Sequence, residues 1–311
     1  MEFQELTLND KTLFDRYLQA GGYENAHLNF TNLFMWRKAT KLRWAESDGY
    51  ICLKTEWQGE KAFCPPIGEG TGLALLLDKL EDVCRQEGFR LEFRGVENKV
   101  RLQLEAARPD YFSFAPDRDD FDYVYRSEDL IKLSGRKYHA KKNHLNSFRK
   151  SYGNHEYQTM DALNALDCIT FLDDWCRQRG YQSGDELDQE RGAVIEALTN
   201  FSTLDLSGGI IYVDGAIQAF SFGEQVRPDM AVIHVEKANA ELRGIYPAIN
   251  QRFCQEAWSD VQYINREEDM GLEGLRLAKE SYHPVKFVEK YRATLSSAKA
   301  NATRCCSNVA S

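Results

Sequence analysis

The sequence predicts an α/β (α+β) protein of two units, each a mixed central sheet flanked by helices. Three observations lead to this fold class. Short apolar stretches bounded by turn residues alternate with amphipathic stretches at helical spacing. The order strands, helix, strand, helix occurs twice, without a sequence repeat of fixed period. The length of 311 residues suits two domains, because single cores stop growing below that size.

The first half of the chain should run helix, helix, three strands, helix, strand, helix. Gly21-Gly22 ends the first helix, and Asp48-Gly49 is a strong turn signal between the first two strands. An aromatic cluster marks the second helix, and a core is its ordinary explanation. The expected elements cover residues 10–19, 30–36, 42–46, 50–57, 61–64, 72–87, 89–94 and 97–105.

Residues 107–128 lose the apolar period and contain Pro109, Pro116 and several Asp, yet also six aromatic residues. They read as a strand-containing crossover between the two halves. The elements expected after it cover residues 137–151, 155–159, 162–179, 185–200, 206–213, 216–224, 230–236, 246–258 and 261–264, followed by a last helix. We therefore expect one unit at 1–128, a second unit carrying the site at 129–295, and a flexible tail at 296–311.

Composition narrows the class of protein. The chain is 43% apolar, and no window approaches 18 uninterrupted apolar residues, so we expect no integral membrane association. Its acidic start lacks the apolar core of a secretory signal. The eight cysteines form no CxxC pair and the six histidines lack ligand spacing. We expect reduced thiols, a cytoplasmic location and no metal.

A polar segment stands out between an apolar strand and the last helix. Asn265 and Arg266 are followed by three acids, Glu267, Glu268 and Asp269. The carboxyl ends of strands in open α/β sheets are where ligands bind, so this segment is a candidate site. A capped, solvated turn is the alternative.

The last helix should bury one face and expose the other. Its expected apolar face contains Leu272, Leu275, Ala278 and Tyr282, and Pro284 ends the helix. Its expected outer face contains Glu273, Arg276, Lys279 and Glu280.

Residues 131–155 form a basic strip on a chain whose net charge is −9. The strip contains no Asp or Glu and seven cations: Lys132, Arg136, Lys137, Lys141, Lys142, Arg149 and Lys150. Such a strip is a candidate site for phosphates, RNA or anionic lipid headgroups. It could equally be a solvated helix face that balances an acidic neighbour.

Two segments carry a family resemblance. LSGRKYHAKKNHLNSFRKSY, at 133–152, and NREEDMGLEGLRLAKESYHP, at 265–284, resemble the phosphatidylglycerol lysyltransferase C-terminal domain family. That family has two tandem units of the general N-acetyltransferase (GNAT) fold and is akin to Fem-type aminoacyltransferases. The resemblance implies transfer of an acyl or aminoacyl group to an amine or hydroxyl. The implied donor carries phosphate and is either acyl-CoA or aminoacyl-tRNA. The alternative is a non-catalytic GNAT-like module that binds a nucleotide, RNA or another phosphate-bearing ligand.

The resemblance also implies where a donor would bind. GNAT proteins hold the donor's phosphates at the start of the helix after the fourth strand, here at 240–251. Glu241 and Tyr246 stand where that loop usually has other residues, and a plain helix start fits as well. The residues implied in donor binding are Arg243, Gly244, Ile245, Tyr246, Lys142, Asn143, Asn146 and Arg149.

The catalytic and substrate-binding roles follow the same resemblance. Glu236, Glu268 or Asp269 would act as the base, although acids after a strand also cap helices. Tyr282 would act as the acid for the leaving group, with core packing as the alternative. The residues implied in substrate binding are Asn265, Arg266, Arg276 and Lys279.

Overall fold

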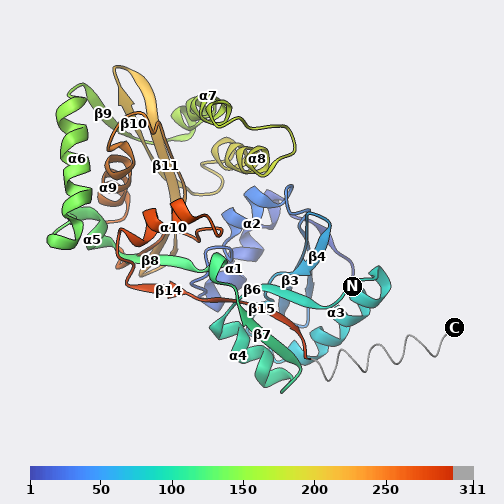
Figure 1. Ribbon diagram of the computed structural model, residues 1–311. Helices are drawn as coiled ribbons and strands as arrows, with labels where there is room; N and C mark the ends of the chain where they lie inside the picture. Colours follow the sequence, from blue (N-terminus) through green and yellow to red (C-terminus); the bar gives the residue numbers. More distant parts are fainter. Residues whose placement is uncertain (297–311) are drawn as a thin grey trace. The chain divides into compact units, whose positions relative to one another are not determined.

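The computed structural model describes residues 1–296, which form two compact units (Figure 1). Most of the tail expected at 296–311 lies outside the described residues. Of the described residues, unit 1 comprises Met1–Asn29, Arg37–Phe121 and residues 288–296. Unit 2 comprises Phe30–Trp36 and Asp122–Phe287. Among the described residues, no helix is long and apolar enough to cross a membrane.

Unit 1 is built on an eight-stranded sheet in the order β1-β2-β3-β4-β6-β15-β7, with β5 paired to β3. Its strands are β1 (Gln4–Glu5), β2 (Arg43–Ser47), β3 (Tyr50–Trp57), β4 (Glu60–Phe63), β5 (Ile67–Gly68), β6 (Glu92–Glu97), β7 (Phe112–Pro116) and β15 (Lys290–Leu295). Its helices include α1 (Lys11–Gly21), α3 (Leu73–Glu87) and α4 (Asn98–Ala107).

Unit 2 is built on a seven-stranded sheet in the order β14-β8-β13-β12-β11-β10-β9. Its strands are β8 (Asp122–Arg126), β9 (His155–Thr159), β10 (Ser207–Val213), β11 (Ala216–Arg227), β12 (Met230–Ala238), β13 (Tyr263–Asn265) and β14 (Lys286–Val288). Its helices include α2 (Phe30–Trp36), α5 (Ser127–Lys132), α6 (His139–Ser151), α7 (Ala162–Gln178), α8 (Glu186–Thr199), α9 (Ile245–Ala257) and α10 (Glu273–Glu280).

The division into units differs from the expected one at 1–128 and 129–295. Helix α2 comes from the first half of the chain but belongs to unit 2, because its largely buried residues pack against α8. Strand β8 also belongs to unit 2, where it pairs with β13. Strand β15 comes from the end of the described chain but pairs with β6 and β7 in unit 1. Pairings between such distant segments leave no local signal in the sequence.

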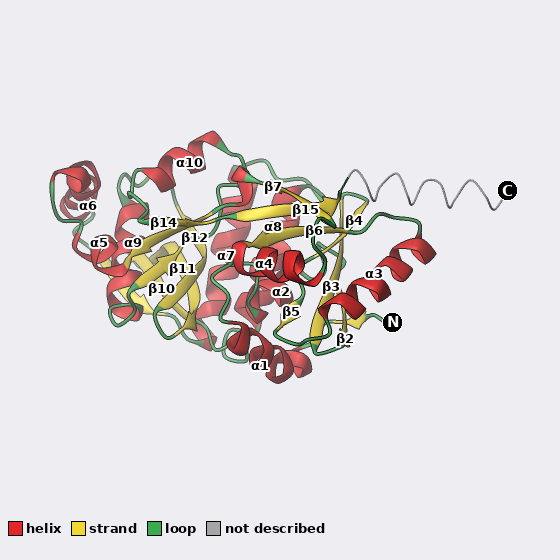
Figure 2. Ribbon diagram, turned by 90° about the horizontal axis from the view of Figure 1, so that it is seen from below, coloured by secondary structure: helices red, strands yellow, loops and turns green. Residues whose placement is uncertain are grey.

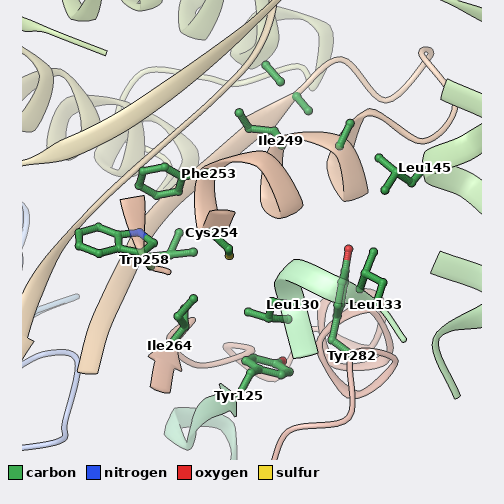
Figure 3. Packing of buried hydrophobic residues seen from close by; sticks show 14 of the residues in the cluster. Tyr125, Leu130, Leu133, Leu145, Ile249, Phe253, Cys254, Trp258, Ile264 and Tyr282 are labelled. Atoms are coloured by element: carbon green, nitrogen blue, oxygen red, sulfur yellow. The ribbon is translucent and has the colours of Figure 1, made fainter. Parts of the chain in front are cut away.

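Helices cover both faces of the sheet in unit 2. On one face, Ile249 and Phe253 of α9 join a buried cluster with residues of β10 to β13, shown in part in Figure 3. On the other face, Phe171 of α7 packs against Phe220 of β11. Adjacent residues of a strand point to opposite faces, so Ala219 joins the α9 cluster while Phe220 does not. Helix α6 packs against α9 on its far side from the sheet (Figures 1 and 2).

Strand β12 contains a bulge that changes which residues face α9. Phe222 pairs with Val235 and Gly223 pairs with Ile233, so His234 is an extra residue in β12. Ile233 belongs to the α9 cluster. In a regular strand, Glu236 lies three residues after Ile233 and would face the side of the sheet away from α9. After the bulge it instead faces α9, where Asn250 donates to it.

Strands β12 and β13 pair in parallel only as far as Val232 and Asn265. Beyond this pair β12 continues to Ala238, whereas β13 has ended. We call the place where the two strands cease to pair the splay.

Helix α10 is rotated in part from the expected orientation, although Glu273 and Glu280 are exposed as expected. Lys279, expected on the outer face, is buried. Leu272 before the helix, expected on the buried face, is exposed, as are Leu277 and Ala278. Lys279 explains the orientation, because its ammonium donates to the backbone carbonyls of Arg266 and Glu268. Tyr282 is buried as expected.

Candidate active site at the splay of unit 2

Glu236 lies at the splay between two hydrogen-bond donors. Nδ2 of Asn250, on α9, lies 3.0 Å from its Oε2. Nη2 of Arg266, which directly follows β13, lies 3.2 Å from Oε1 and 3.3 Å from Oε2. Burial disfavours the guanidinium charge, but Glu236 outweighs this effect and raises the pKa of Arg266. The ion pair therefore links β12 to the end of β13 across the splay.

A second cation, Lys141 of α6, joins this pair. Its Nζ lies 4.1 Å from the ring centroid of Tyr282, and the Arg266 guanidinium carbon lies 4.8 Å from the same centroid. Burial and the Arg266 charge lower the pKa of Lys141 to about 8, although Glu236 acts in the opposite direction. Two cations thus share one carboxylate. Nη1 of Arg266 is buried and has no hydrogen-bond partner among residues 1–296.

Tyr282 has both features that the sequence suggested. It belongs to the buried cluster of unit 2, together with Tyr125 and Leu133 (Figure 3). It also lies beside Arg266 and Lys141, so one edge of the core forms one wall of the site. Burial raises the pKa of its hydroxyl above the usual range, which keeps the group protonated.

Asp269, a candidate base, is fully buried and bound on both oxygens. Arg276 donates to Oδ1 and Oδ2 at 2.8 Å, Tyr123 donates to Oδ2 at 2.6 Å, and the Gly271 amide donates to Oδ1 at 2.9 Å. Burial alone would raise the pKa of Asp269, but the hydrogen bonds outweigh it and lower the pKa to about 2. A carboxylate held in this way is a poor proton acceptor, so the arrangement favours a structural role for Asp269 and Arg276.

The other residues of the polar segment also shape the loop. Nδ2 of Asn265 donates to Asp122 at 3.1 Å, and its Oδ1 accepts from the Glu267 amide at 2.8 Å. Lys279 donates to the carbonyl oxygens of Arg266, at 2.5 Å, and of Glu268. Burial lowers the pKa of Lys279 to about 8. The structure brings Arg266 to Glu236, but it does not bring Asn265, Arg276 or Lys279 into the same cluster.

The start of α9 offers few amide donors to a pyrophosphate. The Ile245 amide donates to the Leu242 carbonyl at 3.1 Å, and Pro247 has no amide hydrogen. Gly244 backs onto α6, Arg243 is exposed, and Tyr246 is half-buried near Trp175. The Ile245 amide and residue 247 therefore cannot donate to a pyrophosphate.

The four residues of α6 expected to bind the donor lie away from the cluster around Glu236. Lys142, Asn143 and Asn146 are exposed, and Arg149, also exposed, donates to Gln251 at 2.9 Å. Lys141, one position earlier, faces inward instead. The strip signalled a basic helix, but only packing reveals which of its lysines turns toward Tyr282.

No pattern in the sequence predicts a role for His234. Its Nδ1 lies 2.9 Å from Oε1 of Glu267 and its Nε2 lies 3.0 Å from Oε1 of Glu224. A lone histidine in an apolar strand carries no signal for these contacts, since they depend on the bulge. In the described part of the chain, no group of three or more His, Cys, Asp or Glu side chains could hold a metal ion.

Comparisons with known proteins agree with this fold. A conserved protein of unknown function from Bacteroides thetaiotaomicron is 37% identical with a TM-score of 0.88, and the match covers 95% of this chain and 99% of that one. The C-terminal domain of a putative lysylphosphatidylglycerol synthetase from Agrobacterium fabrum is 14% identical with a TM-score of 0.63, covering 97% of both chains. A tandem GNAT protein from the clavulanic acid biosynthesis pathway is 12% identical with a TM-score of 0.52, covering 94% of this chain and 98% of that one. The predicted tandem GNAT-like fold is confirmed.

Sequence comparison places the chain in a family. An uncharacterized protein from Mycoplasmoides gallisepticum is 24% identical over 204 residues, which are 63% of this chain and 63% of that protein. Residues 20–294 match the family described as phosphatidylglycerol lysyltransferase, C-terminal. The predicted family is thus confirmed, and the family points to acyl or aminoacyl transfer as the general class of activity. The chain belongs to the phosphatidylglycerol lysyltransferase C-terminal family.

Proposed function

We propose that unit 2 transfers an aminoacyl group from an aminoacyl-tRNA to an amine or hydroxyl acceptor. The observation that carries the proposal is the cluster at the splay, where Glu236 lies beside Arg266, Lys141 and Tyr282. The cluster combines a proton acceptor, surplus positive charge and a protonated hydroxyl, which are the groups that acyl transfer needs. Family membership supports the reaction class, and the solved domain from Agrobacterium fabrum, which is named as that of a putative lysylphosphatidylglycerol synthetase, supports an aminoacyl group.

Each residue of the cluster has a place in the reaction. The acceptor's nitrogen or oxygen attacks the ester carbonyl carbon, and Glu236 takes the proton that the nucleophile loses. The carbonyl oxygen becomes negative and is stabilised by Lys141 and by the unpartnered Nη1 of Arg266. The ester C–O bond then breaks, and the terminal ribose oxygen of the tRNA takes the hydroxyl proton of Tyr282. The proton held by Glu236 restores Tyr282.

The choice of tRNA over CoA depends on two helices. At the start of α9, Pro247 and the bonded amide of Ile245 interrupt the run of amide donors, which weighs against a pyrophosphate. The outer face of α6 exposes Lys142, Arg149 and Lys150, which suit an RNA backbone.

The donor is tested by binding. We expect anisotropy titrations to show salt-sensitive binding of a mixed pool of aminoacyl-tRNA, and calorimetry to show no binding of CoA. The double variant K142E/K150E should bind tRNA more weakly with a shallower salt dependence, because it removes phosphate contacts. Micromolar CoA binding without tRNA binding would overturn the choice of donor.

Turnover is tested with radiolabelled lysyl-tRNA. Hydroxylamine serves as the amine acceptor, and vesicles of phosphatidylglycerol supply a hydroxyl acceptor. We expect Glu236→Gln to lower the rate of product formation by about 10²–10⁴-fold while tRNA binding is retained, because the proton acceptor is lost. Glu190→Gln is the matched control, since Glu190 pairs with Lys237 away from the cluster and should leave the rate unchanged.

A second function is a non-catalytic module that binds RNA or a nucleotide. The observation that favours it is the double engagement of Glu236, whose oxygens already accept from Arg266 and Asn250. The same assays separate the two functions. Salt-sensitive tRNA binding by a wild-type protein that forms no product with either acceptor would establish the module and refute the transferase.

A further inference from the structure

His234 is buried with a carboxylate oxygen at each ring nitrogen. Its side chain is 1% exposed, with Glu267 2.9 Å from Nδ1 and Glu224 3.0 Å from Nε2. Ionised carboxylates only accept hydrogen bonds, and a neutral imidazole has one N–H to donate. Two such bonds therefore require an imidazolium. Asn32 of α2 is uncharged and donates to the same Glu267 oxygen at 3.0 Å.

The position of His234 in the sheet is as specific as its contacts. It is the extra residue of the β12 bulge, and the bulge is what turns Glu236 toward α9. Glu224 lies on β11, the partner strand, while Glu267 directly follows Arg266 beyond the end of β13. Two ion pairs therefore cross the splay, His234 with Glu267 and Glu236 with Arg266. Their β12 members are two residues apart, and their members after β13 are adjacent in sequence.

The backbone conformation of Glu267 supports the His234–Glu267 contact. Glu267 has a φ of 58°, a left-handed conformation that costs free energy for a residue with a side chain. The Asn265 side chain accepts from the Glu267 amide at 2.8 Å, and the Tyr123 amide donates to the Glu267 carbonyl at 3.1 Å. The loop thus holds Glu267 in the conformation that meets His234.

We propose that His234, as an imidazolium bound between Glu224 and Glu267, is a positioning residue that fixes the β12 bulge and the width of the splay, and thereby sets Glu236 against Arg266. The effect on catalysis rests on the proposed function, whereas the charge state of His234 does not.

The hydrogen bonds to the two carboxylates also make the stability that His234 contributes depend on pH. Burial alone would lower the pKa of His234, but the hydrogen bonds that its ring donates to Glu224 and Glu267 outweigh the effect of burial and raise the pKa to about 9. A histidine whose pKa is raised on folding stabilises the protein fully below its unfolded pKa of about 6.5. That stabilisation is lost as the pH rises through about 9. Among residues 1–296, Glu224 and Glu267 are the titratable groups that hydrogen-bond to the ring.

The charge state is tested first, by NMR of protein labelled with ¹⁵N-histidine. Comparison with His234→Gln assigns the ring signals. We expect both ring nitrogens of His234 to be protonated at pH 7.5, with a titration midpoint near 9. In Glu224→Gln, where one carboxylate is lost, the midpoint should fall by about one unit or more. A neutral tautomer at pH 7.5 would overturn the proposal.

Positioning is tested by thermal unfolding and by the hydroxylamine assay. The difference in Tm between wild type and His234→Gln should be largest near pH 6 and shrink as the pH approaches 9. In the assay, loss of the Lys141 charge sets the wild-type alkaline limit near pH 8, because His234 keeps its proton up to about pH 9. In Glu224→Gln the limit should move to lower pH once the His234 midpoint lies below that of Lys141, which a merely structural role would not cause. An unmoved limit with an NMR midpoint below 8 would refute positioning. If wild type forms no product, the proposed function fails, and the NMR and Tm results still decide the charge state.

Discussion

The carboxylate of Asp269 is bound by two side chains and one backbone amide, so it differs from the two acids before it. Its oxygens receive donors from Arg276, Tyr123 and Gly271, and no part of the side chain is exposed. Glu267, in contrast, uses its side chain to bind His234 and Asn32. Glu267 and Asp269 thus have different hydrogen-bond partners, and their positions in a run of three acids do not reveal this difference.

We predict that Asp269→Asn destabilises the protein by about 2–3 kcal/mol, because the partly buried Arg276 loses its charged partner. The pKa of Asp269 is lowered to about 2 on folding. Its contribution is therefore present above the unfolded pKa of about 3.9 and is lost as the pH falls through about 2. Urea unfolding of both proteins at several pH values checks this. A constant difference in unfolding free energy from pH 6 down to pH 2 would contradict it.

Several residues of the candidate site could be chosen from the sequence alone. Glu236, Arg266 and Tyr282 were picked by their places in the family pattern, and the structure brings them together, although their roles remain predictions. Lys141 could not be separated from Lys142, because neighbouring helical residues point about 100° apart and only packing selects between them. His234 could not be found, because its contacts depend on a bulge that no local pattern announces.

Helices α6 and α9 approach each other closely at Gly244. This residue has a φ of 89°, and a Cβ placed on it would lie 2.2 Å from the carbonyl oxygen of His144 in α6. Glycine is required here for two reasons: the left-handed backbone and the lack of room. The glycine that the sequence suggested for an anion cradle is explained by helix packing.

We predict that Gly244→Ala destabilises the protein by about 2 kcal/mol or more, because α6 must move away and the backbone is strained. Gly192→Ala is the matched control. Gly192 lies inside α8, and a Cβ there has nothing within 4 Å. That change should be neutral or stabilising by about 0.5–1 kcal/mol. Equal effects of the two substitutions in thermal unfolding would refute the packing argument.

Most helices and strands of regular pattern were predictable, because their apolar periods are local. The orientation of α10 was not, since Lys279 is buried by its hydrogen bonds to two backbone carbonyls and rotates the helix away from the position that its apolar pattern predicts. The facing of Glu236 was not predictable either, because one extra residue in β12 reverses the alternation.

At the scale of the molecule, the chain completes each unit with a segment from the other end. Unit 2 takes α2 from the first 36 residues, and unit 1 takes β15 from residues 290–295. In the sheet of unit 1, β15 lies between β6 and β7 and pairs with both. A boundary drawn between residues 121 and 122 therefore does not separate two complete folds.

We predict that fragments 1–121 and 122–296, expressed separately, are each insoluble or unfold without cooperativity. The first lacks an internal strand of its sheet, and the second lacks the helix packed on α8. Co-expression supplies both missing segments and should recover soluble protein. A cooperative thermal transition of either fragment alone, followed by circular dichroism, would contradict the prediction.

The late position of β15 bears on how the chain folds during synthesis. When β6 and β7 leave the ribosome, the strand that belongs between them has not yet been made, so the two edges that will receive it remain open while all of residues 122–287 are translated. Open strand edges are prone to pair with other chains. During this stage, chaperones or infrequent encounters between chains must keep the exposed edges of β6 and β7 from pairing with other chains. The exposure ends only when β15 emerges.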